Sequence, residues 1–164
     1  SFNMAQLWSL PIVYIIENNK YGMGTSVERA SATTDLYHRG AAHRIPGEKI
    51  NGMDVLAVKA AGEKALKYCR AGKGPYILEM ETYRYRGHSM SDPAKYRTKA
   101  ELEEYKNSDP IEVVKNEIIK KKIASNEELE KIGKEIIEEV KSAADFALKS
   151  SFPDNKELYT DVYL

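Results

Sequence analysis

Residues 49–83 read KINGMDVLAVKAAGEKALKYCRAGKGPYILEMETY, and this stretch decides the fold class. Asp54 stands where a helix cap is expected, and the helix should run to about Arg70. Its apolar positions recur at helical spacing on one face: Val55, Val58, Ala61, Ala65, Leu66 and Cys69. Residues 49–51 and 76–83 are predicted strands on either side. Strand, helix and strand joined by short connections predict a βαβ crossover and a parallel sheet.

The sequence before this unit adds one helix end and one strand. Residues 1–10 have the apolar spacing of a helix that lacks a capped beginning, so we expect the chain to be a piece of a longer protein. Pro11 stops this helix. Residues 12–16 (IVYII) are a continuous apolar run, which predicts a strand buried on both faces. Residues 20–51 show little periodicity, and long ordered loops of this kind are usually functional.

After residue 97 the pattern becomes helical. Thr98 with Glu101, and Ser125 with Glu128, have the spacing of capping boxes. The run Asp109, Pro110, Glu112 has a cap, a first-turn proline and an acidic residue in the expected order. The last helix carries an apolar stripe: Leu129, Ile132, Ile136, Val140, Ala143 and Ala147. Its other face is mostly Glu and Lys, with pairs such as Glu127 and Lys131, and a polar tail follows from residue 152.

Composition excludes several function classes. Lys and Arg number 25 and Asp and Glu number 25, so the net charge of zero gives no electrostatic case for nucleic acid or an anionic membrane. The single cysteine, Cys69, cannot form an internal disulfide and fits a reducing compartment. It lies on the apolar helix face, which favours a core position. No apolar run approaches the ~20 residues that a membrane span needs.

A first group of candidate site residues follows the strand at 12–16: Glu17, Asn18, Asn19, Lys20, Tyr21, Gly22, Met23 and Gly24. Ligands of open α/β sheets bind outside the carboxyl ends of strands. An Asn side-chain oxygen and a free backbone carbonyl are hard ligands that suit magnesium, and the glycines allow the backbone to approach a phosphate closely. The alternative is a strand that simply ends in an Asn-rich turn.

A second group follows the strand at 76–83: Arg84, Arg86, His88, Ser89, Ser91, Asp92 and Arg97. Arg and His suit a phosphate or a transition-state anion, and serines beside arginines suit a phosphorylation switch. The alternative is a solvated basic loop in which Asp92 pairs with Arg97. His38 and His43 are expected in solvent. The spacings of a zinc site, a nucleophile elbow, a GxGxxG fingerprint and a phosphate-binding GxxxxGK loop are not found in the sequence.

Three longer segments carry a family resemblance: ENNKYGMGTSVERA (17–30), INGMDVLAV (50–58) and ETYRYRGHSMSDP (81–93). They closely resemble the alpha subunits of the pyruvate dehydrogenase component of 2-oxoacid dehydrogenase complexes. The resemblance covers nearly the whole chain and is strongest up to Arg97. It implies an α/β fold of the thiamine-diphosphate-binding type, truncated at the N-terminal side. Residues 1–97 would be a partial core with two active-site loops, and residues 98–164 a helical C-terminal region of the same domain.

The resemblance also implies a cofactor site. Family members bind thiamine diphosphate through magnesium. Asn19 matches the asparagine whose side chain ligates the metal, and Tyr21, next to Gly22, matches the residue whose carbonyl does so. His88 matches the active-site histidine near the cofactor and the acyl intermediate. Arg84 matches an arginine that anchors this loop, with Asp92 in its hydrogen-bond network.

The family's Gly-Asp-Gly motif, which supplies the metal's aspartate, does not occur in this sequence. The resemblance further implies a heterotetramer in which a beta subunit supplies the glutamate that activates the cofactor, and a multienzyme complex with a lipoyl-bearing acetyltransferase core. The chain alone is therefore expected to be inactive. In eukaryotic relatives, serines of these loops are phosphorylated, and Ser89 and Ser26 match two such positions.

Two other functions stay open. One is the alpha subunit of an acetoin dehydrogenase or of another 2-oxoacid dehydrogenase; Gly87-His88-Ser89-Met90 favours pyruvate over branched-chain substrates. The other is a non-catalytic interaction domain, which the charged C-terminal helices fit. A bacterial cytoplasm is favoured as the location, with the mitochondrial matrix if the source is eukaryotic.

Overall fold

The structure is a computed structural model that describes residues 1–163. These residues divide into two compact units, one from Ser1 to Asn116 and one from Glu117 onward, and each is described by itself. The division falls later in the chain than the predicted change of character at residue 97. That residues 1–97 and 98–164 belong to one domain stays a prediction.

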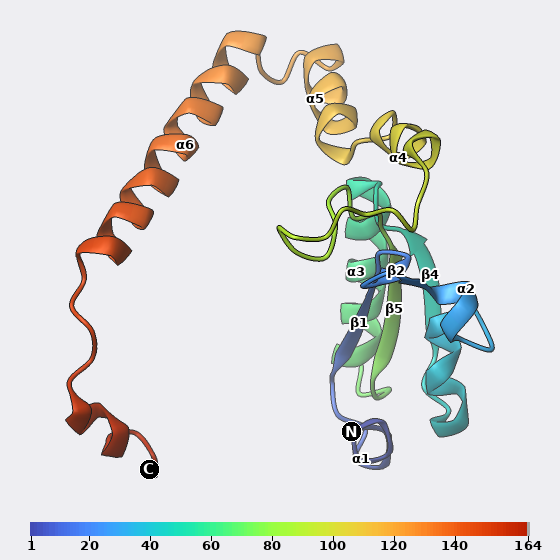
Figure 1. Ribbon diagram of the computed structural model, residues 1–164. Helices are drawn as coiled ribbons and strands as arrows, with labels where there is room; N and C mark the ends of the chain where they lie inside the picture. The colour runs from blue at the N-terminus through green and yellow to red at the C-terminus, as the bar shows by residue number, and fades with distance from the viewer. Residues whose placement is uncertain (164) are drawn as a thin grey trace. The chain divides into compact units, whose positions relative to one another are not determined.

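The first unit is built on a parallel sheet of three strands, in the order β1-β5-β4. The strands are β1 (Val13–Asn18), β4 (Gly47–Asn51) and β5 (Tyr76–Glu81). Helix α3 (Val55–Arg70) connects β4 to β5, which confirms the predicted crossover (Figure 1). The Asp54 carboxylate caps α3 as predicted, accepting from the backbone N–H groups of Leu56 at 2.9 Å and Ala57 at 3.0 Å.

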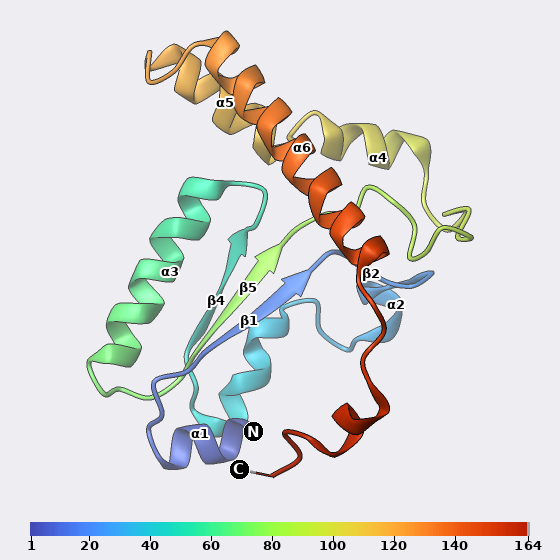
Figure 2. The ribbon, with the colours of Figure 1, turned by 90° about the vertical axis from the view of Figure 1, so that its left-hand side faces the viewer.

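The two faces of the central strand β5 have different partners. Tyr76, Leu78 and Met80 pack with Ala61, Ala65 and Cys69 of α3 and form the core cluster. Ile77 and Glu79 point to the other face, where the 3-10 helix η1 (Leu36–His43) lies against β4 and β5. Figure 2 shows the three strands side by side with α3 along one side of the sheet. Because side chains alternate along a strand, one residue step decides which of these environments a side chain enters.

Some predicted burial is wrong. The run at 12–16 does form a strand, but Ile15 is 64% exposed and only Asn18 of β1 is buried. The reason is that β1 is an edge strand in this structure, with a neighbour on one side only. On α3, Val55 and Leu66 of the predicted apolar face are also about half exposed, at 48% and 45%.

Short elements occupy the remainder of the first unit. They are α1 (Phe2–Leu7), β2 (Tyr21–Gly22), β3 (Thr25–Ser26), α2 (Val27–Ala30), α4 (Lys99–Lys106) and α5 (Pro110–Lys120), the last of which continues past Asn116. The cap of α5 is as predicted, since the Asp109 carboxylate accepts from Ile111 N–H at 2.8 Å. The predicted box of α4 is only half formed. Thr98 accepts from Glu101 N–H at 3.1 Å, but the Glu101 carboxylate binds elsewhere.

The second unit consists of α6 (Asn126–Lys149) and the 3-10 helix η2 (Asn155–Tyr159). The Ser125–Glu128 capping box is confirmed, with bonds of 3.2 Å and 2.7 Å. Lys131 pairs with Glu135 at 3.8 Å and not with Glu127, whose pKa is lowered by hydrogen bonds at the helix start. The predicted apolar stripe is present and lies exposed. Within residues 1–163, no helix combines the length and the apolar character that crossing a membrane requires.

Candidate functional site

A hollow lies at the carboxyl ends of β1 and β5, where both predicted loops begin. Its lining residues are Glu17, Asn19, Thr82, Tyr83 and Arg84. The two strands are parallel and in register, with Asn18 opposite Glu81, so their following residues leave the sheet side by side. The structure therefore brings together two residues of the first predicted group, Glu17 and Asn19, and one of the second, Arg84.

The turn after β1 has a specific hydrogen-bonded shape. The Asn18 side-chain oxygen accepts from Lys20 N–H at 3.2 Å, and Lys20 adopts a left-handed φ of 73°. Lys20 carbonyl then accepts from Val27 N–H at 3.0 Å across the small hairpin of β2 and β3. Because hydrogen-bonded and non-hydrogen-bonded pairs alternate in an antiparallel ladder, the next pair, Tyr21 and Ser26, is of the second kind. The Tyr21 carbonyl consequently points away from the paired strand.

Charged side chains tie this turn to the edge of the sheet. Lys20 Nζ lies 2.5 Å from a Glu81 carboxylate oxygen, and Lys49 Nζ lies 2.6 Å from Asp35 and 3.7 Å from Glu81. The hydrogen bond to Asp35 raises the pKa of Lys49, and the same contact lowers the pKa of Asp35. The network joins the first loop to β4 and β5. These ion pairs therefore anchor the turn that carries Asn19 to the sheet.

The hydroxyl groups of Tyr21 and Tyr83 converge on one carboxylate oxygen of Glu101, at 3.0 Å and 3.1 Å. Burial and the hydrogen bond to Glu101 raise the pKa of Tyr21 to about 12, and burial raises that of Tyr83. Tyr105 stacks on Tyr83 with ring centroids 3.9 Å apart. Helix α4 thereby connects the first loop to the end of β5.

Side chains hold the second loop mainly by hydrogen bonds to its backbone groups. Arg84 donates to the His88 carbonyl at 3.0 Å, and His88 N–H donates to Asp92 at 2.7 Å. Asp92 also accepts from Tyr96 hydroxyl at 2.8 Å, and the bond from His88 N–H is the main cause of its lowered pKa. The predicted alternative, an Asp92–Arg97 pair, is wrong: Arg97 donates instead to the carbonyls of Arg84 and Tyr85.

The other predicted site residues lie around this hollow and not in its lining. Tyr21 is half-buried and Gly22 exposed in the hairpin, while the His88 side chain is exposed. Ser89 is exposed, with its hydroxyl 3.1 Å from that of Ser91. Ser26 is half-buried at the start of α2 and caps it with no side-chain hydrogen bond.

Four residues of the site were missed at the level of sequence: Thr82, Tyr83, Glu79 and Glu101. Thr82 and Tyr83 follow β5 directly, so their position at a strand end was a usable signal. Glu79 and Glu101 look like ordinary members of a strand and of a charged helix. Only their burial and their distant partners distinguish them.

The atoms around the hollow fit a cation bound to a phosphate group. Asn19 offers an amide oxygen and Tyr21 an outward carbonyl, both of which are hard ligands. Within the described residues, the Thr82 hydroxyl oxygen is buried and makes no hydrogen bond, which marks an unsatisfied polar atom in the lining. Arg84 adds a positive charge on the same wall. Within residues 1–163, no group of three or more His, Cys, Asp or Glu side chains is placed to hold a metal ion.

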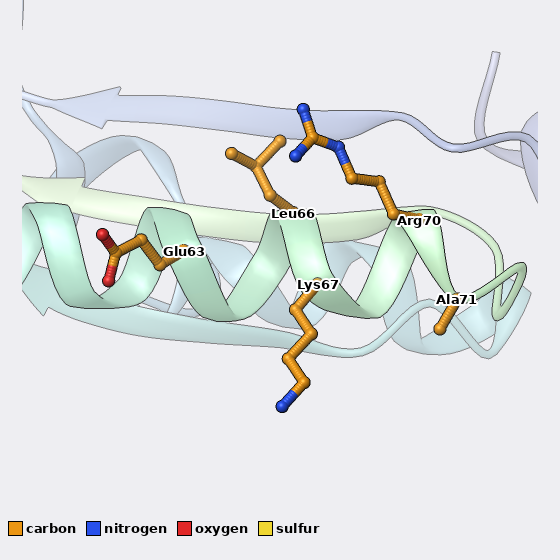
Figure 3. Close-up of a pocket in the computed structure, with 5 residues that line it drawn as sticks. All are labelled: Glu63, Leu66, Lys67, Arg70 and Ala71. Atoms are coloured by element: carbon orange, nitrogen blue, oxygen red, sulfur yellow. The ribbon is translucent and has the colours of Figure 1, made fainter.

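Two other features offer no comparable site. Cys69 is buried, burial raises the pKa of its thiol, and Sγ lies 3.5 Å from the Ile12 carbonyl, which confirms a core role. A second hollow is lined by residues of α3 and its C-terminal end, and Figure 3 shows its two cationic side chains, Lys67 and Arg70, on opposite sides of the helix. Diverging side chains cannot converge on one ligand.

Comparison with known proteins shows the family to which the chain belongs. The model of the dehydrogenase E1 component family matches residues 1–156, and the chain belongs to this family. The chain is 58% identical over 165 residues to the pyruvate dehydrogenase E1 component subunit alpha of Rhizobium meliloti (strain 1021), covering 100% of the chain and 47% of the relative.

Eukaryotic relatives match as well. The mitochondrial pyruvate dehydrogenase E1 component subunit alpha of Dictyostelium discoideum is 50% identical, over 100% of the chain and 44% of the relative. The somatic mitochondrial form of Sus scrofa is 50% identical, over 99% of the chain and 42% of the relative. The chain thus spans about half the length of the curated relatives it matches. These relatives bear out the predicted family, and the α/β structure with its parallel sheet bears out the predicted fold class.

Proposed function

We propose that the chain is part of the alpha subunit of a pyruvate dehydrogenase, which decarboxylates pyruvate oxidatively and transfers the acetyl group to lipoamide. The observation that carries the proposal is the meeting of Asn19 and Arg84 in one hollow at two strand ends. The names of the relatives support the substrate. When bound, thiamine diphosphate supplies the electron sink for loss of carbon dioxide.

The chain's own residues would bind and orient this cofactor. The Asn19 amide oxygen and the Tyr21 carbonyl are proposed ligands of magnesium, beside the backbone of Gly22. Magnesium prefers near-octahedral oxygen coordination with a carboxylate and phosphate oxygens. Such a carboxylate is not among the ligands proposed here, so we expect the isolated chain to bind the cofactor weakly.

The second loop would serve the later step. Arg84 holds the loop through the His88 carbonyl, and this leaves the His88 imidazole exposed and free to act. We propose that this imidazole hydrogen-bonds developing charge or guides acetyl transfer. The proposed partners are a beta subunit in a heterotetramer and a lipoyl-bearing acetyltransferase core. A bacterial cytoplasm, or the matrix of mitochondria, is the proposed location, in keeping with bacterial and mitochondrial relatives.

Ser89 and Ser26 are proposed regulatory phosphorylation sites. Ser89 is exposed and directly follows His88, so a phosphate there would repel an anionic substrate or disorder the loop. Ser26 is half-buried in the hairpin. An unchanged activity in Ser89→Glu would contradict the role of Ser89.

The experiment is pyruvate-dependent dye reduction with thiamine diphosphate and magnesium. It uses the complete subunit co-expressed with its beta partner, and offers pyruvate, a branched-chain 2-oxoacid and acetoin in parallel. Preference for pyruvate that Asn19→Ala abolishes is the expected result. Preference for acetoin or the branched-chain acid would replace the substrate. Folded and paired proteins that turn over none of the three would favour an interaction domain.

A further inference from the structure

Glu79 is a charged residue in the most buried part of the first unit. It lies on the central strand β5 with 0% exposure. Its carboxylate accepts from the Asn18 side-chain amide at 2.7 Å and from Tyr37 N–H at 2.9 Å. The nearby cations Lys20 and Lys49 bind Glu81 and Asp35, so among the described residues Glu79 has hydrogen bonds but no salt bridge.

Packing does not explain a carboxylate at this position. Ile77, two residues earlier on the same face of β5, is fully buried, so this face of the strand accepts apolar side chains. Burial of a carboxylate without a cation is costly, and an apolar replacement is often neutral or stabilising. The charge therefore points to a purpose beyond stability of the core.

The hydrogen bonds of Asn18 indicate what this purpose is. Its amide group has a donor end and an acceptor end. A carboxylate only accepts, so Glu79 takes the NH₂ end and turns the oxygen toward Lys20 N–H, 3.2 Å away. That second bond shapes the turn in which Lys20 takes its left-handed φ of 73°. Asn19 and Tyr21 are the residues on either side of Lys20.

We propose that Glu79 is a positioning residue of the cofactor site: through Asn18 it fixes the turn that presents the Asn19 amide and the Tyr21 carbonyl. The positioning role rests on the proposed function, since it needs a cation at these two oxygens. The relay Tyr37–Glu79–Asn18–Lys20 consists of hydrogen bonds within the chain, and it does not depend on the proposed function.

The test exchanges donor and acceptor within the relay. Glu79→Gln introduces an NH₂ group that faces either Asn18 or Tyr37 N–H, so donors outnumber acceptors. Asn18→Asp alone sets two carboxylates against each other. The double variant Glu79→Gln/Asn18→Asp restores the match, because Gln donates to Asp while both keep an oxygen for the backbone N–H groups. Glu63→Gln, on the exposed surface of α3, is the matched control.

Two quantities are measured. The first is the hydrogen exchange rate of the Lys20 and Tyr37 amides in the complete subunit paired with its partner, by NMR. The second is the affinity for Mn²⁺ in the presence of thiamine diphosphate, in the complete subunit paired with its partner. Loss of one hydrogen bond corresponds to about tenfold in each quantity. We expect faster exchange and weaker binding in Glu79→Gln, recovery of both in the double variant, and no change in Glu63→Gln.

Each other outcome overturns part of the inference. Unchanged Lys20 exchange in Glu79→Gln would disprove the relay. Faster exchange with unchanged Mn²⁺ affinity would leave Glu79 a structural residue. If the wild-type enzyme binds no Mn²⁺ with thiamine diphosphate, the proposed function and the positioning role both fail, whereas the exchange data still decide the relay. If Glu79→Gln does not fold, the relay requires that the double variant folds and is more stable than Asn18→Asp.

Discussion

The Tyr21 hydroxyl donates a hydrogen bond of 3.0 Å to the Glu101 carboxylate, 80 positions further along the chain. Glu101 was expected to close a capping box with Thr98, and instead it accepts from Tyr21 and Tyr83 together. The Glu101 carboxylate thus binds two hydroxyl groups from different loops, and not the backbone N–H of Thr98 at the start of its own helix. Helix α4 is held to the candidate site by this contact.

Tyr21→Phe should change the response of the protein to alkaline pH. The pKa of Tyr21 is raised from its ordinary 10.0 to about 12, so the protonated hydroxyl stabilises the fold below pH 10, and this contribution is lost as the pH rises toward 12. The variant should be less stable by about 1 kcal/mol at neutral pH and should lose stability less steeply above pH 10. Urea unfolding at a series of pH values measures both, with exposed Tyr159→Phe as the control. Parallel curves for wild type and variant would refute the assignment.

Asp92→Asn should loosen the second loop. Asp92 accepts three hydrogen bonds, from His88 N–H, Ala94 N–H and Tyr96 hydroxyl, and an amide cannot accept on both sides. Because its pKa lies below 3.8, wild-type Asp92 supports the loop above that pH, and the support is lost as the pH falls through the lowered pKa. Tryptic cleavage after Lys95 at neutral pH should be faster in the variant.

The matched control for this loop is Ser91→Ala, which removes an exposed hydroxyl and leaves Asp92 intact. Hydrogen exchange of the His88 and Ala94 amides tests the behaviour at low pH. In the wild type, protection of these amides should decline below pH 3.8, and in Asp92→Asn it should show no such decline. Equal cleavage rates in Asp92→Asn and Ser91→Ala would mean that the carboxylate does not hold the loop.

Gly40→Ala and Gly62→Ala should have opposite effects. A Cβ at Gly40 would lie 2.5 Å from Ile77 Cδ1 and 3.0 Å from the Ile45 carbonyl, so η1 would have to move off the sheet. We expect a loss of about 1–3 kcal/mol. At Gly62, inside α3, a Cβ meets nothing within 4 Å, and alanine should stabilise by about 0.5–1 kcal/mol. Chemical denaturation of both variants gives the two signs, and a stable Gly40→Ala would contradict the close packing of η1.

His88→Ala should separate chemistry from loop structure. The loop contacts of His88 are made by its backbone N–H and carbonyl, so alanine can keep them. In the paired enzyme we expect thiamine diphosphate affinity to be retained, while acetylation of lipoamide falls about a hundredfold or more. Lys95→Ala, an exposed change in the same loop, should leave acetylation near wild type. Full acetylation by His88→Ala would end the catalytic assignment.

Local order was readable from sequence. The period of apolar residues in 54–70 predicted α3, and Asp54 and Ser125 cap their helices as their positions imply. The two predicted strands placed Asn19 and Arg84 after strand ends, and the structure has both in the lining of one hollow. These features depend on residues within a few positions of one another, because helix and strand periods and caps are local hydrogen-bonding and burial patterns.

Partnerships between distant residues were decided by tertiary structure. The parallel register of β1 with β5 places Asn18 opposite Glu81 and within reach of Glu79, and no local pattern encodes that register. For the same reason Glu101 bonds to Tyr21 and not to its own helix start. Sequence by itself determined the three strands of the parallel sheet, helices α3 to α6 and the positions of the two loops, but not the short elements β2, β3, α2 and η1 inside the first loop. Only the tertiary structure decided which carboxylates are buried and what they hold, because burial and partner choice depend on the strands that become neighbours.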